Sequence, residues 1–214
     1  QVALNVLRPI SRKYDKAEHE YPKELDMLAS LLDGMNEGAP GSAGATSATG
    51  GGAKDNTGEI KNGANLSTVL GIIEMCWGDC GLLLAMPRQG LGNAAIAAVA
   101  NEEQLERFKG TWAAMAITEP GCGSDSAAIR TTATKDGDDY ILNGEKIYVT
   151  SGARADSVVV WATLDKNIGR AAIKSFVVKH GTPGMQVTRL EKKLGIKASD
   201  TAAITFTDCR VPAA

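Results

Sequence analysis

The sequence predicts an α+β protein, with a helical N-terminal half followed by an all-β half that begins after residue 111. Two observations predict this class. Apolar residues recur at helical spacing up to about residue 108, and short β-rich runs separated by Gly, Asn and Asp follow Trp112. The composition is that of a folded soluble chain, since 43% of its 214 residues are hydrophobic and 22% are charged. Helices first and strands afterwards are typical of the α+β class.

The first clear helix is expected over residues 21–33. Pro22 suits the first helical position, where its missing N–H costs nothing. Apolar residues then recur at helical spacing, at Leu25, Leu28 and Leu32. We expect Gly34 to end the helix as a left-handed cap.

The segment 38–58 has no aromatic residue and no Leu, Ile, Val or Met. It has nothing to bury, so we expect a flexible Gly/Ser/Ala-rich insertion. From residue 65 the apolar density rises at Leu66, Val69, Leu70, Ile73 and Trp77. Because these residues fall on nearly every side of a helix, the helix is expected to be buried within a bundle. Two shorter helices are expected over 93–100 and 102–108.

The β half is expected to contain strands over 113–118, 129–134, 140–142, 146–150, 157–163, 172–178 and 203–207. Asp136-Gly137 and Asn143-Gly144 are the strongest short hairpin signals. The domain boundaries that follow are 1–111 for a helical domain and 112–214 for a β domain.

Several classes of function are disfavoured by composition and spacing. A net charge of −2 gives no reason to expect a nucleic-acid groove, and the most apolar window, residues 66–86, is interrupted by Glu74 and Asp79. Cys76 and Cys80 share a helical face, but no histidine or second cysteine pair lies nearby, so we expect no metal site. Four cysteines and no signal segment indicate a reducing, cytoplasmic location.

Four ordered motifs lie in the second half of the chain: TEPGCGSD at 118–125, DDYILNGEKIYVTSG at 138–152, TPGM at 182–185 and LGIKASDTAAITFTDCRVP at 194–212. Together they resemble the acyl-CoA dehydrogenase family of flavoproteins. The resemblance implies an N-terminal helical bundle followed by an antiparallel β-barrel middle domain that carries flavin motifs. A dinucleotide fingerprint is excluded, because Ser126 stands where a third glycine is needed and strands follow.

The resemblance implies FAD as the cofactor and assigns it a set of binding residues: Met115, Ile117, Thr118, Gly123, Ser124, Tyr148, Val149 and Thr150. In the family, the residue at Thr118 bonds the pyrimidine edge of the flavin and the residue at Thr150 touches N5. Ser124 reaches the phosphate region of the cofactor or of acyl-CoA, so it is also a substrate-binding candidate. Tyr148 replaces the family's usual tryptophan. From residue chemistry, Gly121 and Gly123 are expected to let the backbone turn sharply and approach a phosphate closely.

The activity that the resemblance implies is α,β-desaturation of an acyl-CoA thioester in fatty-acid or related lipid catabolism. Electrons would pass to FAD and then to an electron-transfer flavoprotein, within a homo- or hetero-tetramer in the cytoplasm, or in the mitochondrial matrix of a eukaryote. No residue matches the family's catalytic carboxylate, which is expected on a C-terminal helical domain beyond residue 214. These 214 residues alone are therefore expected to be inactive. Two alternatives stay open: a non-catalytic partner subunit of a heteromeric dehydrogenase, and an acyl-CoA oxidase-like flavoprotein.

Overall fold

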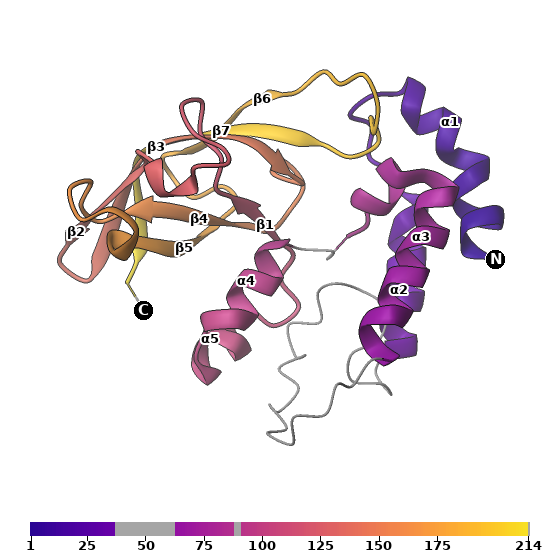
Figure 1. Ribbon diagram of the computed structural model, residues 1–214, viewed down its shortest axis with the longest axis horizontal. Coiled ribbons are helices and arrows are strands. Elements are labelled where there is room, and N and C mark those ends of the chain that lie inside the picture. The colour runs from indigo at the N-terminus through magenta and orange to yellow at the C-terminus, as the bar shows by residue number, and fades with distance from the viewer. Residues whose placement is uncertain (37–62, 88–90, 214) are drawn as a thin grey trace. The chain divides into compact units, whose positions relative to one another are not determined.

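The computed structural model describes residues 1–36, 63–87 and 91–213, which form two compact units (Figure 1). One unit comprises Gln1–Trp112 with Lys192–Ser199, and the other comprises Ala113–Glu191 with Asp200–Ala214. The first holds the α-helices and the second holds every strand of the described chain, as the α+β prediction requires. The loop 192–199 groups with the helices, although the sequence suggested no reason to separate it from the strands around it. The expected insertion over 38–58 lies outside the described residues.

The helical unit begins with a π-helical turn, η1, that runs directly into α1. Its elements are η1 (Ala3–Leu7), α1 (Arg8–Lys16), α2 (Glu24–Asn36), α3 (Gly63–Leu84), α4 (Leu91–Val99) and α5 (Glu102–Arg107). Side chains from η1, α1, α2, the end of α3 and the 192–199 loop form one buried cluster: Leu7, Tyr14, Leu25, Leu28, Leu82, Ala85, Met86 and Ala198. Burial of this apolar surface is the main force that holds these elements together.

Helix α2 begins later and ends later than the sequence predicts. Pro22 precedes the helix, and its carbonyl accepts a hydrogen bond from the N–H of Leu25 at 3.0 Å, in a tight turn that leads into Glu24. Gly34 lies inside α2, which continues to Asn36. A glycine inside a helix costs only about 1 kcal/mol relative to alanine, so it does not by itself end one.

Helix α3 is kinked at Asp79, whose φ of −172° and ψ of 119° are extended rather than helical. The carboxylate of Asp79 accepts hydrogen bonds from the N–H of Leu82 at 2.8 Å and from the hydroxyl of Ser11, so it caps the segment that follows the kink. Helix α3 meets η1 at Gly78, where a Cβ would lie 3.0 Å from Ala3.

The expected burial of α3 is wrong for its first part. Leu66, Val69, Leu70, Ile73 and Trp77 are each between 53% and 59% exposed. The close approach of α3 to η1 is at Gly78, beyond these exposed residues. The buried residues belong instead to the segment after the kink and the turn that follows it.

The β unit is a curled, seven-stranded sheet with strand order β1-β4-β2-β3-β7-β6, in which β5 also pairs with β4. The strands are β1 (Ala113–Ala116), β2 (Thr132–Asp136), β3 (Asp139–Thr150), β4 (Ser157–Thr163), β5 (Ile173–Lys179), β6 (Met185–Leu190) and β7 (Thr201–Pro212), with short 3-10 turns η2 (Ser126–Ala128) and η3 (Gly169–Ala172). The sheet is mixed rather than wholly antiparallel, because β4 runs parallel to β1 and to β2. The predicted strand 157–163 is confirmed as β4.

One of the two predicted hairpin turns is confirmed and the other is wrong. Asp136 and Asp139 pair across the β2–β3 turn, where Gly137 has a φ of +61°. Asn143-Gly144 lies instead inside β3, which is one strand and not two. There the register with β7 shifts, and Gly144 takes a φ of +153° at a position where Thr131 leaves no room for a Cβ. The glycine thus serves close packing rather than a turn.

Strand β6 is absent from the predicted strands, although its sequence MQVTRL begins with apolar and polar residues in alternation, and it pairs with β7. In the described part of the chain, no helix combines the length and the apolar character needed to cross a bilayer. The same residues contain no group of three or more His, Cys, Asp or Glu side chains placed to hold a metal ion.

Candidate functional site

The TEPGCGSD motif forms a tight turn directly after β1. The N–H of Glu119 donates to the carbonyl of Cys122 at 2.9 Å, and the N–H of Cys122 donates back to the carbonyl of Glu119 at 3.1 Å. The expected sharp turn is present, and neither Gly121 nor Gly123 has a positive φ in it. What the glycines supply is space. A Cβ at Gly121 would meet no atom within 4 Å, and one at Gly123 would meet only the Thr118 methyl, at 3.8 Å.

The second predicted motif lies at a bulge in β3. The register of β3 against β7 shifts between Lys146 and Val149, so the residues between them leave the regular ladder. Tyr148 there adopts a φ of +57°, which is uncommon for a residue with a side chain, and the residue is 62% exposed. Val149 is fully buried, so its side chain faces the core and only its backbone is available to a ligand.

The two motifs, far apart in the sequence, lie next to each other in the structure. The N–H of Ile147 donates to the carbonyl of Thr118 at 2.9 Å. The ammonium group of Lys146 donates to the carbonyl of Ile117, also at 2.9 Å. The bulge of β3 is therefore fixed against the end of β1 and the start of the turn.

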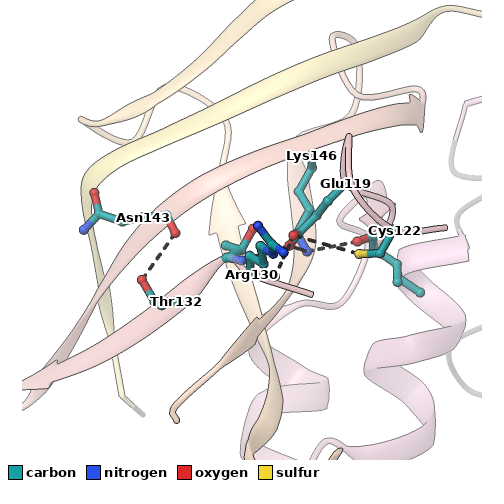
Figure 2. Close-up of polar contacts among 8 residues, drawn as sticks. Glu119, Cys122, Arg130, Thr132, Asn143 and Lys146 are labelled. Carbon is teal, nitrogen blue, oxygen red and sulfur yellow. Dashed lines mark hydrogen bonds and ion pairs between the residues drawn. The ribbon is translucent and has the colours of Figure 1, made fainter. Parts of the chain in front are cut away.

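A buried ion pair lies beneath this junction (Figure 2). The ammonium nitrogen of Lys146 is 2.8 Å from Oε1 of Glu119, and the two side chains are 0% and 6% exposed. The Glu119 carboxylate also accepts hydrogen bonds from the N–H of Arg130 at 2.6 Å and of Thr131 at 2.9 Å. Oε2 of Glu119 also lies 4.0 Å from the Cys122 sulfur.

Burial and hydrogen bonding act on this pair in different directions. Burial by itself raises the pKa of the Glu119 carboxyl, but the bonds from Lys146 and from the backbone of Arg130 and Thr131 outweigh it and hold that pKa below its usual value. Burial lowers the pKa of the Lys146 ammonium, and Glu119 only partly opposes that shift.

The other predicted site residues are distributed around the junction. Met115 is half-buried in β1, on the face opposite the buried Ala114 and Ala116. Ile117 and Thr118 are half-buried, whereas Gly123 and Ser124 are exposed on the turn. Thr150 is half-buried at the end of β3, opposite Thr201 of β7.

The groups at this junction fit the chemistry of a flavin nucleotide. Among the described residues, nothing accepts a hydrogen bond from the N–H of Gly121, Gly123 or Ser124, and these donors lie on an open, exposed turn. Backbone donors of this kind suit a phosphate oxygen. The hydroxyls of Thr118 and Thr150 suit the polar edge of a planar ring, and the exposed ring of Tyr148 suits an apolar face.

Sequence reasoning missed the parts played by Lys146 and Glu119. The available signal was a lysine placed directly before Ile147, Tyr148 and Val149 in a predicted strand. Its partner lies 27 positions earlier. No spacing rule joins two such residues, because a sheet pairs segments over any sequence distance.

Comparison with known proteins shows the family to which the chain belongs. Residues 114–209 match the acyl-CoA dehydrogenase middle domain, so the curled sheet belongs to the class of acyl-CoA dehydrogenase domains. Acryloyl-CoA reductase (NADH) of Anaerotignum propionicum is 32% identical over 100% of this chain and 52% of its own length. The chain as a whole belongs to the acyl-CoA dehydrogenase family.

Solved structures of the same family superpose on both parts of the chain. Butyryl-CoA dehydrogenase of Megasphaera elsdenii has a TM-score of 0.78 and 31% identity, over 99% of this chain and 53% of that protein. A glutaryl-CoA dehydrogenase of Mycobacterium smegmatis, solved in complex with FADH2, has a TM-score of 0.75 and 27% identity, over 100% of this chain and 51% of that protein. The chain thus spans about half the length of the relatives it matches.

Proposed function

We propose that the β unit binds FAD and that the whole protein desaturates an acyl-CoA thioester between its α and β carbons, with electron-transfer flavoprotein as the acceptor. The observation that carries this proposal is the junction of the two motifs, where the N–H of Ile147 binds the carbonyl of Thr118 beside the open glycine turn. The family relationship supplies the substrate class, and the chemistry of the site supports the cofactor.

The residues of the junction have distinct parts in this proposal. The hydroxyls of Thr118 and Thr150 hold and orient the polar edge of the isoalloxazine ring, and Tyr148 shields one side of it from water. The N–H groups of Gly123 and Ser124 bind phosphate oxygens of the cofactor or of the substrate. FAD supplies the hydride-accepting ring when bound.

Glu119 is not the base that removes the substrate's α proton. Its Oε1 accepts from Lys146 and from the N–H of Thr131, and its Oε2 accepts from the N–H of Arg130. A carboxylate held by three donors and buried from solvent is a weak base, and its lowered pKa agrees. We therefore assign the base to a part of the whole protein outside these residues.

The experiment that tests this function is an FAD titration of the whole protein, followed by flavin fluorescence and equilibrium dialysis. Replacing Thr150 with Val removes one hydrogen bond and is expected to weaken FAD binding by about 0.5–1.5 kcal/mol, with turnover also reduced. Thr134→Val is the matched control, because Thr134 is exposed on β2 and outside the junction. Anaerobic addition of an acyl-CoA should bleach the visible absorbance of the flavin. Equal FAD affinity and equal turnover in Thr150→Val and wild type would contradict the assignment of the Thr150 hydroxyl to the flavin site.

A further inference from the structure

The Lys146–Glu119 pair connects three segments that the sequence keeps apart. Lys146 reaches from β3 to the carbonyl of Ile117, just after β1, and to the carboxylate of Glu119 in the turn. Glu119 in turn holds the backbone N–H groups of Arg130 and Thr131, which lead into β2. The two charged side chains therefore make four contacts: the ion pair between them, the lysine–carbonyl bond, and the two bonds from backbone N–H groups to the carboxylate. The backbone bond between Ile147 and Thr118 lies beside them.

The Lys146–Glu119 ion pair is expected to contribute little to the free energy of folding. Moving a carboxylate and an ammonium group out of water costs several kcal/mol each, and the attraction between them returns little more than that cost. The lowered pKa of Lys146 shows that burial still disfavours its charge. Two apolar side chains of the same volume could fill the space at similar or better stability. What apolar residues could not do is fix the direction of a carbonyl and of two N–H groups.

The groups that the pair fixes are those that shape the candidate cofactor site. Ile117 and Thr118 carry the backbone at the end of β1, and Ile147 precedes the exposed Tyr148 at the bulge. If the turn and the bulge moved apart by a small distance, the hydroxyl of Thr118 and the ring of Tyr148 would no longer share one ligand. Productive sites require geometry held to about 0.5 Å.

We propose that Lys146 and Glu119 are positioning residues of the cofactor site, which hold the 118–124 turn and the 147–148 bulge in the one relative geometry that admits FAD. This inference rests on the proposed function. The pair touches neither cofactor nor substrate in this assignment, and it acts through the backbone that it binds.

The test compares wild type with Lys146→Met, with the double variant Glu119→Gln/Lys146→Met, and with the control Arg210→Met. The double variant removes both charges together, so it leaves no buried charge unpaired and is expected to fold even where Lys146→Met alone does not. Arg210 forms exposed ion pairs with Asp136 and Asp139 on the same sheet, so its variant controls for loss of an ion pair as such.

Two measurements separate positioning from stability. In the flavin-free protein, amide hydrogen exchange at Ile147, Arg130 and Thr131 is expected to accelerate at least tenfold in the double variant, while the thermal midpoint stays within a few degrees of wild type. In the FAD titration, the double variant is expected to bind at least tenfold more weakly, whereas Arg210→Met matches wild type in both measurements.

The outcomes distinguish the inference from the function on which it rests. Unchanged exchange at these three amides in the folded double variant would overturn the inference, whether or not FAD binds. Equal FAD affinity in wild type and double variant would also overturn it, while leaving the proposed function in place. No FAD binding by the wild-type whole protein would refute the proposed function, and the exchange measurement would still decide whether the pair holds the two segments.

Discussion

Tyr148 stores backbone strain at the candidate cofactor site, and this leads to a prediction with an unusual sign. Its φ is +57°, a left-handed conformation that costs a residue with a Cβ roughly 1–2 kcal/mol. Glycine avoids that cost but loses about 0.5–1 kcal/mol of chain entropy relative to alanine. At an ordinary strand position alanine is therefore the more stable of the two residues. At position 148 the order should reverse, with Tyr148→Gly more stable than Tyr148→Ala by about 0.5–1 kcal/mol.

The comparison isolates the backbone, because both variants lose the whole ring and its contacts. Glu145→Ala and Glu145→Gly are the control pair, since Glu145 is exposed on the same strand, pairs with Thr205 and has no positive φ. The assay is urea unfolding followed by tryptophan fluorescence, with equal m values required across the four variants. At position 145 the alanine variant is expected to be more stable than the glycine variant. The same order at position 148 would show that Tyr148 does not have a left-handed backbone in solution. Both Tyr148 variants should bind FAD more weakly than wild type, because both lack the aromatic face.

Two further predictions concern packing and pH. Gly181 and Gly184 both have positive φ values, +82° and +88°, but a Cβ meets nothing within 4 Å at Gly181 and overlaps the backbone of Thr207 and Cys209 at Gly184. Gly184→Ala should therefore lower the free energy of unfolding by about 1–3 kcal/mol more than Gly181→Ala in urea titrations, and equal losses would argue against the clash. The hydrogen bond from the Tyr14 hydroxyl, together with backbone bonding and Lys13, lowers the pKa of Glu24 from 4.5 to about 2. Glu24 therefore stabilises the helical unit above pH 4.5, and this stabilisation is lost as the pH falls towards 2. Glu24→Gln should make the thermal unfolding midpoint, followed by circular dichroism, depend less on pH in this range. An unchanged pH dependence would contradict the lowered pKa of Glu24.

The parts of the fold that could be predicted from the sequence are those specified by neighbouring residues. Strand β4 is a nearly continuous apolar run, and its bounds were predicted correctly. The Asp136-Gly137 turn was identified because a two-residue hairpin needs a residue that tolerates positive φ. The motif segments were located by resemblance, and the structure brings them together through the Ile147–Thr118 bond. Their contacts with a cofactor stay a prediction.

The parts that could not be predicted depend on partners far away in the chain. Asn143-Gly144 has the composition of a turn, yet the packing of Thr131 against Gly144 keeps it inside a strand. The apolar residues at the start of α3 have the pattern of a buried helix, yet burial depends on what packs against them and not on the pattern. The left-handed backbone of Tyr148 follows from the β3–β7 register, which no local pattern encodes.

The complete burial of Lys146 also gives the β unit an internal reporter of its own opening. Amine-reactive reagents modify only neutral amines that they can reach, and the Lys146 ammonium is inaccessible in the folded sheet. Exposed lysines, such as Lys135 on β2 and Lys179 on β5, are expected to react from the native state. Lys146 becomes available only when β3 separates from the turn that holds it. The rate at which Lys146 is labelled therefore measures how often β3 and the turn separate by local unfolding, without any engineered probe.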